Sequence, residues 1–436
     1  MPAEAAALQA APHGLSIAVV GAGLAGLAAA WLLGRTHRVT LFERQPRPGF
    51  TAASVPVPGA DGRPVRVDVP LRVFYPGYYP TLTRLYDALG VRSEPVSYAT
   101  SFARDDGRLY FRYRNLRLGD RSYGWLAPQD LLLGAEARAI VRGLLRFHRE
   151  AVPAMRQPGL ADQSIGAYVA AHAYPLAFVE GLLLPAICTV CTCTTDQARG
   201  FPAAVIIDYL ARGLARESVR RAQQGADEVE RLLLQGIPDL RCNARIAAVQ
   251  RRGAGMVLHM DDGSQAAFDH VVMATQANQA RRLLPDASTA EAQVLEGFRY
   301  QPVQVLMHSD ASFMPAQRRH WSPVNLRHMP GPGAPESTIW VNAVQPALRR
   351  APPVFQTVHP QRDARAGLQI GRADFERPMV DAGSQRALHG LAALHAQPDR
   401  RLWFCGSYAQ AGIPLLESAV HSALAVAKRL GSRVLD

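Results

Sequence analysis

The sequence predicts an α/β fold in which a Rossmann-type domain is interrupted by an α+β domain. Three observations lead to this prediction. A strand, a glycine-rich turn, a helix and a second strand follow one another between Ile17 and Glu43. Buried-strand patterns return at His270–Thr275 and Arg401–Gly406, and a long helix, Leu415–Leu430, ends the chain. Because these elements lie so far apart, we expect the chain to leave one nucleotide-binding domain and re-enter it.

The glycine-rich turn has the spacing that dinucleotide phosphates require. It reads GAGLAG between the apolar run IAVV and a helix of small residues. Gly21 permits a tight turn, Gly23 lets backbone N–H groups approach a pyrophosphate, and Gly26 lets helix and strand pack closely. The helix N-terminus adds its partial positive charge. The predicted phosphate-binding residues are Gly21, Gly23, Leu24, Ala25 and Gly26.

An acidic residue closes this unit. Glu43 ends the second strand, VTLF, where its carboxylate can accept hydrogen bonds from a ribose. Arg44 follows and is included among the predicted cofactor-binding residues. A GxGxxG turn alone is weak evidence, but a turn without a nucleotide leaves Glu43 unexplained. The pattern therefore predicts dinucleotide binding.

Composition excludes several classes of protein. The 436 residues are 48% hydrophobic and 19% charged, as in globular proteins. The apolar stretch Leu15–Leu33 holds three glycines at turn spacing and follows no basic segment, which disfavours a membrane anchor. Five cysteines without a secretory signal indicate a reducing, cytoplasmic compartment. The chain contains no HExxH, GxSxG or P-loop motif, so hydrolase and kinase functions have no support.

The net charge of +12 comes almost entirely from arginine, since Lys428 is the only lysine. This skew resembles codon bias, and we expect no nucleic-acid partner. A positive field also favours an anionic substrate or an acidic lipid surface. Arg138, Arg142 and Arg146 recur at every fourth position of a predicted helix. A solvated outer face is the favoured interpretation, and peripheral contact with a membrane surface is the alternative.

Turn residues and periodicity delimit the remaining elements. Pro80 opens a predicted helix, and Gly90 closes it in the left-handed conformation. In the first half we expect a hairpin at 60–62, a strand at 66–74, a helix at 81–89, a hairpin turn at 105–107 and a helical region at 128–173. In the second half we expect strands at 240–250, 256–260, 266–268, 270–275, 299–308, 338–344, 354–358 and 401–406, and helices at 276–284 and 415–430.

Several motifs in the same order resemble the FAD-dependent amine-oxidoreductase superfamily, which includes amine oxidases and phytoene-desaturase-type enzymes. The bacterial branch of predicted NAD/FAD-binding oxidoreductases is the most similar. The motifs are GAGLAGLAAAWLL with VTLFER, VDVPLRVFYPGYYPTLTRLYDALGV, DHVVMATQANQARRLL, VQVLMHSDASFMP with HWSPVNL, and CGSYAQAGIPLLESAVHSALAVA. The resemblance implies noncovalent FAD, an FAD-binding domain formed by residues 1–75, 236–278 and 398–436, and a substrate domain formed by residues 76–235 and 279–397.

The resemblance also implies individual FAD contacts. Gly21, Gly23 and Gly26 would hold the pyrophosphate, and Glu43 the adenosine ribose. Towards the two ends of the cofactor, the implied contacts are the backbone of Ile246 at the adenine, Ala274 along the dinucleotide, Gly406 and Ser407 at the ribityl and phosphate region, the amides of Leu415 and Leu416 at the isoalloxazine carbonyl, and Leu71 and Arg72 beside the flavin ring.

The chain departs from the family pattern in three places. Gly49-Phe50 stands where the family has two glycines, and Ser407 stands where it has an aspartate. Pro70, Leu71 and Arg72 replace small residues, which places a bulky or cationic group beside the flavin. The substrate of the family therefore cannot be transferred to this chain.

The position of Lys428 bears on the chemistry. Many amine oxidases of this superfamily place a lysine near flavin N5, whereas Lys428 lies deep in the last helix. We therefore expect hydride transfer between flavin and a small, largely apolar substrate, such as an acyl or isoprenoid chain undergoing desaturation, reduction or isomerisation. Amine oxidation, an FAD-binding protein without turnover and an NAD-only dehydrogenase are the alternatives.

Arg72, Tyr75 and Tyr78 are the predicted substrate-side residues. Arg72 would hold a substrate carboxylate or stabilise reduced flavin, and a salt bridge or a pyrophosphate contact explains it equally well. Cys188, Cys191 and Cys193 lack a fourth metal ligand nearby, so we expect buried small residues and no metal. The alternative is that one of these three thiols lies near the flavin. His308, Asp310, His320 and Trp321 are interpreted as structural.

Overall fold

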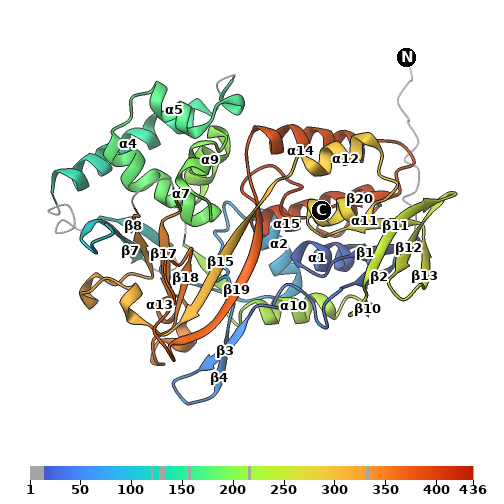
Figure 1. Cartoon of the computed structure of the whole chain (residues 1–436), viewed down its shortest axis with the longest axis horizontal. Helices are drawn as coiled ribbons and strands as arrows, with labels where there is room; N and C mark the ends of the chain where they lie inside the picture. The colour runs from blue at the N-terminus through green and yellow to red at the C-terminus, as the bar shows by residue number, and fades with distance from the viewer. Residues whose placement is uncertain are drawn as a thin grey trace.

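The computed structural model describes residues 14–118, 121–126, 134–155, 159–214, 218–329 and 333–435. A five-stranded parallel sheet with the order β10-β2-β1-β14-β20 lies on the right in Figure 1. Its strands come from three distant parts of the chain: β1 (Ser16–Val20), β2 (Arg38–Phe42), β10 (Asp239–Arg241), β14 (His270–Met273) and β20 (Leu402–Phe404). The predicted Rossmann-type arrangement, which the chain leaves and re-enters, is confirmed.

Two apolar helices build the core next to this sheet. All ten residues of α1 (Leu24–Leu33) are buried, because the helix packs against α15 (Leu416–Arg429) and α10 (Ala226–Leu234). The next helix, α2 (Pro80–Leu89), begins at a proline and ends at Gly90 with φ +71°, as predicted. It packs against both α15 and α10. The two ends of the chain therefore share one hydrophobic core.

A three-stranded antiparallel ribbon, β11-β12-β13, stands beside the parallel sheet (Figure 1). Its strands are β11 (Ile246–Arg252), β12 (Gly255–Met260) and β13 (Gln265–Phe268). Three helices complete this part of the fold, with α12 packed against both of the others: α11 (Ala277–Leu283), α12 (Thr289–Glu296) and α14 (Ala382–His395).

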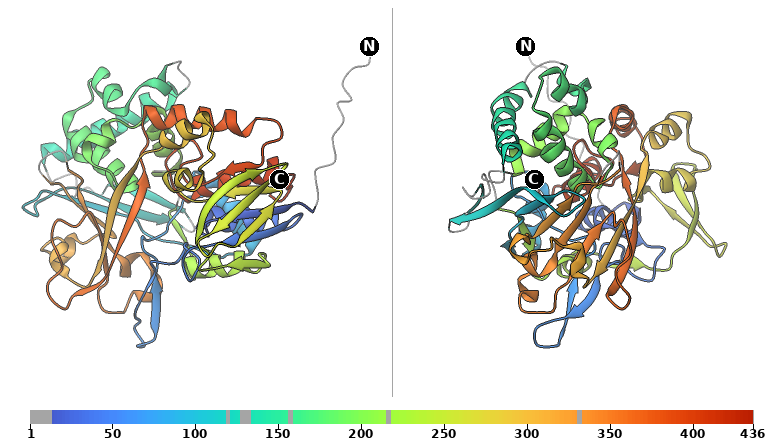
Figure 2. Two further views of the ribbon diagram at one scale, coloured as in Figure 1. Left: turned by 45° about the vertical axis from the view of Figure 1, so that its right-hand side comes forward. Right: turned by 60° about the vertical axis from the view of Figure 1, so that its left-hand side comes forward.

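The second domain contains an eight-stranded sheet with the order β19-β15-β18-β17-β16-β6-β7-β8. Figure 2 shows the helices of residues 135–214 gathered at one end of this sheet, away from the hairpin of β3 (Val55–Pro58) and β4 (Pro64–Val67). The eight strands are β6 (Thr100–Ala103), β7 (Leu109–Leu118), β8 (Arg121–Trp125), β15 (Tyr300–His308), β16 (Val324–Arg327), β17 (Glu336–Trp340), β18 (Phe355–Val358) and β19 (Gln369–Pro378).

The helical region carries the predicted arginine series. Arg138 and Arg142 lie exposed on α4, whereas Arg146 is half-buried and donates to Glu150. The remaining elements are β5 (Ser93–Pro95), α4 (Ala135–Ala154), α5 (Ile165–Ala171), α6 (Leu176–Phe178), α7 (Leu184–Cys191), α8 (Thr195–Arg199), α9 (Ala203–Tyr209), β9 (Arg220–Ala222) and α13 (Val341–Val344). In the described part of the chain, no helix is long and apolar enough to cross a bilayer.

Four expectations about elements require correction. The strand expected at 66–74 ends at Val67, because the chain then turns through Pro70 and its backbone bonds to a side chain of the second sheet. The strand expected at 240–250 is two strands in different sheets, β10 and β11. The segment 341–344 is helical, and residues 369–378, where no element was expected, form the long strand β19. Part of the helical region expected at 128–173 lies outside the described residues.

The predicted fold class, an α/β Rossmann-type domain with a sheet-rich second domain, is confirmed. The strands of the two main sheets come from different segments of the chain, as the topology shows. The exact division into 1–75, 236–278 and 398–436 against 76–235 and 279–397 stays a prediction.

Candidate functional site

The glycine turn between β1 and α1 has the backbone that its sequence predicts. Gly21 adopts φ +102°, which favours glycine, and its N–H donates to the carbonyl oxygen of Phe42 at 2.8 Å. A Cβ atom on Gly26 would lie 1.8 Å from the carbonyl oxygen of Gly21, so only glycine fits. A Cβ atom on Gly23 would meet nothing within 4 Å. The turn therefore leaves open space at Gly23, in front of the α1 N-terminus.

Glu43 is buried beside this turn. Its Oε2 accepts from the N–H of Ala22 at 2.9 Å, and its Oε1 accepts from the N–H of Gln45 at 2.9 Å. Each carboxylate oxygen keeps a second lone pair for a ligand hydroxyl. The carboxylate thus both fixes the glycine turn and stands at the predicted ribose position. Arg44 next to it is exposed.

The departure Gly49-Phe50 lies directly against the glycine turn. The Gly49 N–H donates to the carbonyl oxygen of Ala22 at 3.0 Å, and a Cβ on Gly49 would lie 3.7 Å from Glu43 Oε2. Phe50 is buried and receives the guanidinium of Arg72 on its ring, 4.1 Å from the ring centroid. Arg72 Nη2 also donates to the carbonyl oxygen of Phe50. The loop of Leu71 and Arg72 is therefore joined to the glycine turn.

Two acidic side chains compensate the charge of Arg72. Burial lowers the pKa of the Arg72 guanidinium, and Asp68 and Glu230 oppose this shift. Burial raises the pKa of Asp68, which accepts from the N–H of Ala226 at 3.2 Å. The geometry displays a cation–π contact and a hydrogen bond to Phe50, neither of which was among the predicted alternatives for Arg72. Its functional role stays a prediction.

Buried Gln356 on β18 orders the same loop. Its Oε1 accepts from the N–H of Leu71 at 2.9 Å, and its Nε2 donates to the carbonyl oxygen of Asp68 at 2.5 Å. The side chain has no exposed surface. The Gln356 side chain therefore makes the hydrogen bonds to this loop that a neighbouring strand would otherwise make. It also connects the loop to the second sheet.

The C-terminal segment approaches the glycine turn from the other side. Gly406 has φ +156°, and its N–H donates to Ser422 Oγ on α15 at 3.0 Å. A Cβ on Gly406 would lie 3.7 Å from the carbonyl oxygen of Thr275, the residue after Ala274. Ala274 in turn contacts both Gly21 and Gly26. Ser407 is half-buried at this junction.

The N-terminus of α15 has no side-chain cap. The N–H of Leu415 donates to the carbonyl oxygen of Ile413 at 2.7 Å, so Leu416 is the first residue of the helix whose N–H points out of its end. Glu417 accepts from the N–H groups of Thr81 and Leu82 at 3.0 and 2.9 Å. Glu417 thereby fixes α2 against the start of α15.

The predicted adenine end lies where β11 begins. The N–H of Ala244 donates to the carbonyl oxygen of Glu43 at 2.9 Å, which brings Ile246 close to the end of β2. A surface cavity of about 320 Å³ opens there, between the strand end and the antiparallel ribbon. It is lined by Phe42, Arg241, Asn243, Ala244, Arg245, Met260, Asp261, Asp262 and Ser264.

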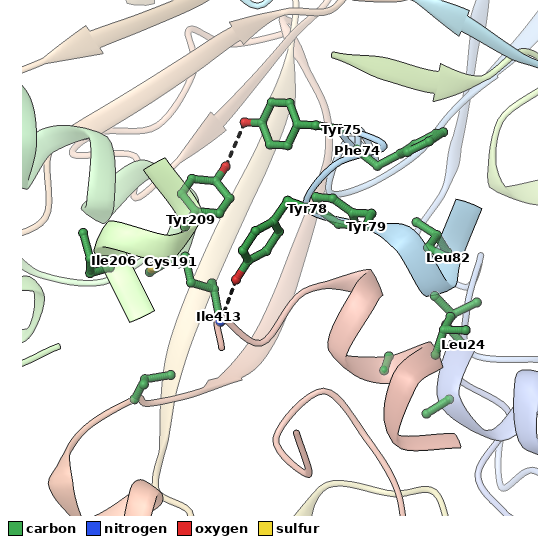
Figure 3. Packing of buried hydrophobic residues seen from close by; sticks show 14 of the residues in the cluster. Leu24, Phe74, Tyr75, Tyr78, Tyr79, Leu82, Cys191, Ile206, Tyr209 and Ile413 are labelled. Carbon is green, nitrogen blue, oxygen red and sulfur yellow. Dashed lines mark hydrogen bonds between the residues drawn. The ribbon is translucent and has the colours of Figure 1, made fainter. Parts of the chain in front are cut away.

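An aromatic cluster forms the wall between α2 and the helices of the second domain (Figure 3). Tyr75 and Tyr209 share a hydrogen bond of 2.8 Å between their hydroxyls. The Tyr78 hydroxyl accepts from the N–H of Ile413 at 3.3 Å. Tyr78 and Tyr209 pack edge to face, with ring centroids 4.8 Å apart. Tyr79 packs against both Tyr75 and Tyr78.

These tyrosines are neutral hydrogen-bonding groups. Burial raises the pKa of Tyr78 to about 12, and it raises the pKa of Tyr75 and Tyr209 further. A base that must be ionised near neutral pH is therefore not available in this cluster. The cluster is suited to shape an apolar cavity and to donate or accept single hydrogen bonds.

The cysteine cluster is buried beside the tyrosines. Cys188, Cys191 and Cys193 are free thiols, and burial raises the pKa of Cys191. Within the described residues, no group of three or more His, Cys, Asp and Glu side chains is arranged to hold a metal ion. The electrostatic neighbours of Cys191 include Arg377 on β19.

The predicted site residues thus fall into two neighbouring groups. The glycine turn, Glu43, Ala274, Gly406 and the Arg72 loop are linked by direct contacts, whereas Tyr75 and Tyr78 belong to the adjoining aromatic wall. Their functional roles stay predictions. Sequence reasoning missed Gln356, Arg377 and Glu417, because each becomes informative only when β18, β19 or α15 meets a distant segment.

Two of the residues interpreted as structural, His308 and Asp310, belong to a separate polar network. His308 has no exposed surface, and its Nε2 lies 2.8 Å from Thr357 Oγ1 on β18. Its Nδ1 accepts from the N–H of Asp310 at 3.2 Å. Burial lowers the pKa of His308 to about 4. The network joins β15, β18 and β17, since Thr357 contacts Thr338 at 2.8 Å.

Comparison with known proteins adds the following. The family described as NAD(P)-binding Rossmann-like domain matches residues 19–89. No curated protein matches the chain. Among solved structures, putrescine oxidase bound to putrescine is 15% identical with a TM-score of 0.65, covering 96% of this chain and 99% of that protein.

Two further solved structures have similar values. The CLA-producing fatty acid isomerase from P. acnes is 14% identical with a TM-score of 0.64, over 95% of this chain and 98% of its own. Cyclohexylamine oxidase from Brevibacterium oxydans IH-35A is 14% identical with a TM-score of 0.63, over 96% of this chain and 100% of its own. The predicted resemblance is therefore confirmed at the level of the fold, along nearly the whole chain.

Proposed function

We propose that this chain, which shares the fold of those oxidases and of the isomerase, is an FAD-dependent oxidoreductase. Its substrate is a small, largely apolar molecule. The observation that carries the proposal is the junction of the glycine turn with three other segments. Glu43 accepts from the N–H of Ala22 in the turn, and Gly49, next to the Phe50–Arg72 contact, donates to the carbonyl oxygen of Ala22. Gly406, in the segment that leads to α15, lies beside Thr275 at the end of the neighbouring strand β14.

The residues present fit an FAD molecule. Gly23 presents open space at an unobstructed helix N-terminus, which suits a pyrophosphate. Glu43 can accept ribose hydroxyls, and Ala244, which lines the cavity, is hydrogen-bonded to the carbonyl oxygen of Glu43. At the other end, Gly406, Ser407 and Leu416 would hold the ribityl chain and the ring. When bound, FAD supplies hydride transfer at its ring nitrogen.

The chain's own residues prepare the site for this chemistry. The helix N-terminus at Leu416 offers N–H groups and a partial positive charge to an electron-rich atom. Arg72, held by Phe50 and compensated by Asp68, adds a fixed cation on the cofactor side. Tyr75 and Tyr78 line the substrate side and remain neutral at physiological pH.

Chemistry on a C–C bond is favoured over amine oxidation. Lys428 is exposed in the last turn of α15, far along the helix from Leu416, so it does not serve as a lysine beside the ring. The tyrosines of the aromatic wall are neutral, and Asp208, the carboxylate in the electrostatic environment of Tyr78, is already paired with Arg212 at 2.6 Å. An acyl or isoprenoid chain fits such a wall. The fold similarity to putrescine oxidase keeps amine oxidation as the second candidate.

All five cysteines are free thiols, which supports a cytoplasmic location for the protein. Contact of the exposed Arg138 and Arg142 with a membrane surface stays a secondary proposal, since their charges would favour acidic lipids.

The test is anaerobic reduction of the FAD-loaded protein. We expect an acyl compound either to bleach the oxidised flavin by donating hydride or, after the flavin has been reduced with dithionite, to restore its absorbance by accepting hydride. Amines such as putrescine should do neither. Bleaching by amines alone would replace the proposal with amine oxidation. A protein that binds FAD but neither exchanges hydride with the acyl compounds, amines, NADH or NADPH nor moves the double bond of an unsaturated acyl compound would contradict an enzymatic function.

A further inference from the structure

Arg377 is a half-buried cation that forms no ion pair with any carboxylate of the described residues. It lies near the C-terminal end of β19, opposite Gln301 on β15. Its Nη2 donates to the carbonyl oxygen of Pro414 at a long 3.4 Å. Gln301 donates to the carbonyl oxygen of Thr192 at 2.7 Å. Arg377 therefore stands between the end of α7 and the segment that leads into α15.

The surroundings of Arg377 are neutral. Its electrostatic neighbours are Cys191, Tyr79 and Cys193. Burial raises the pKa of both Cys191 and Tyr79, so these groups stay protonated. In the described part of the chain, no carboxylate forms an ion pair with Arg377. Because a guanidinium cannot be deprotonated in a protein, its charge is present and uncompensated.

Arg72 also forms no ion pair among the described residues, but it differs from Arg377 in its surroundings. Asp68 and Glu230 lie in its electrostatic environment, and Phe50 provides both a ring face and a carbonyl oxygen. The two guanidiniums also repel each other. Among the described residues, carboxylates contribute to the electrostatic environment of Arg72 and not to that of Arg377. The carboxylate that would pair with Arg377 can therefore come from a ligand.

The Arg377 side chain is accessible to a ligand. Although the surrounding protein desolvates the guanidinium, the residue remains half-buried and keeps exposed surface. Tyr79 and Cys191 provide an apolar environment next to it. A guanidinium binds planar carboxylates with two parallel hydrogen bonds, and it repels ammonium groups.

We propose that Arg377 binds the carboxylate of the substrate, and that the substrate is an acid with an apolar body packed on the tyrosine cluster. The inference rests on the proposed function, because it places the ligand on the substrate side of the FAD site. It goes further by naming the charged group of the substrate and the residue that selects it. Arg377 is thus a specificity-determining residue.

The experiment compares three probes with the same ten-carbon chain: decanoate, decanol and decylamine. Binding to FAD-loaded protein is measured from the change in the visible flavin spectrum, and binding to the apoprotein from the shift in melting temperature. We expect decanoate to bind more tightly than decanol, and decylamine to bind least. Arg377→Met should weaken decanoate binding about tenfold or more while leaving decanol binding unchanged. Arg377→Lys should recover part of the affinity.

Arg372→Met provides the matched control, because Arg372 is an exposed arginine on the same strand. It should leave the affinities for all three probes unchanged. Tighter binding of decylamine than of decanoate by the wild-type protein would overturn the inference without requiring any variant. Equal decanoate affinity in wild type and Arg377→Met would overturn it as well. If the protein fails to bind FAD, the proposed function is overturned instead. The melting-temperature shifts of the apoprotein then still test whether Arg377 binds the carboxylate.

Discussion

Gly23 and Gly26 differ in what a single methyl group would meet. At Gly26 the methyl would collide with the backbone of Gly21, whereas at Gly23 it would enter open space. Gly23 also has φ −73°, which any residue adopts. The apoprotein therefore needs glycine at position 26 for packing. It tolerates alanine at position 23 unless a ligand occupies the space.

We predict that Gly23→Ala leaves the melting temperature of the apoprotein unchanged and weakens FAD binding at least about tenfold, the effect of about 1.4 kcal/mol. The physical reason is that the added methyl occupies the volume of the pyrophosphate. Titration of apoprotein with FAD, followed by flavin fluorescence, gives the affinity. Gly26→Ala is the contrasting variant and should lower the melting temperature even without cofactor. Unchanged FAD affinity in Gly23→Ala would show that the phosphates lie elsewhere.

For single residues, the sequence predicts the geometry that depends on neighbours in the chain, and it does not predict contacts with distant segments. Gly21, Gly26 and Glu43 act within one strand–turn–helix–strand unit, so their spacing determines their geometry. Arg377 lies in a strand of alternating charged residues, for which the sequence led to no predicted element. Its burial depends on β15 and on Pro414, neither of which its own neighbourhood reveals.

Among the elements, the loop from Asp68 to Phe74 depends on a side chain from another sheet. Gln356 satisfies a carbonyl and an N–H of this loop from a fully buried position. Gln356→Ala would leave both groups unpaired in the interior. We predict a loss of about 2–4 kcal/mol in the free energy of unfolding, measured by urea denaturation. FAD affinity should fall too, because the loop carries Arg72. A change below about 0.5 kcal/mol would mean that water replaces the side chain.

The histidine that joins β15 to β18 makes the second sheet sensitive to acid. His308 is neutral when folded, with a pKa of about 4 against an ordinary value of 6.5. Below pH 6.5 the unfolded chain binds a proton that the folded chain does not, so stability falls as pH decreases towards 4. Integrated over this window, the group contributes up to about 3 kcal/mol. We predict that unfolding free energies between pH 7.5 and 5 decline less steeply in His308→Gln than in wild type. Parallel slopes would assign the acid sensitivity to other groups.

Elements with their own end signals were predictable, and those defined by partners were not. Pro80 and Gly90 delimit α2 at the expected residues. The expected strand at 66–74 ends early because Gln356 supplies its hydrogen bonds from the side. β19 was not predicted, because charged residues alternate along its sequence. Its pairing with β15 nevertheless makes it part of the second sheet.

The whole molecule joins its two domains around the proposed cofactor. Glu417 on α15 holds the start of α2, Ile413 holds Tyr78, and Arg377 reaches the segment before α15. The parallel sheet and the aromatic wall are thus coupled through residues 406–417. A ligand that contacts both parts stabilises the folded chain by mass action.

The order of motifs along the chain made this architecture predictable, since several separated motifs agreed on one nucleotide-binding domain. The arrangement of the second sheet was not predictable in detail. Its order places β19 and β8 at opposite edges, and β16 pairs in parallel with β6 across more than two hundred residues of chain. Pairings of such long range leave no signal in local sequence patterns.

The central claim is that the glycine turn at Gly21–Gly26 binds FAD. The most direct measurement is a titration of purified apoprotein with FAD and, separately, with NAD and NADP, followed by calorimetry. The account predicts one FAD bound per chain, release of intact FAD on denaturation, and much weaker binding of either nicotinamide dinucleotide. Tight binding of NAD or NADP without binding of FAD, or binding of none of the three, would contradict it.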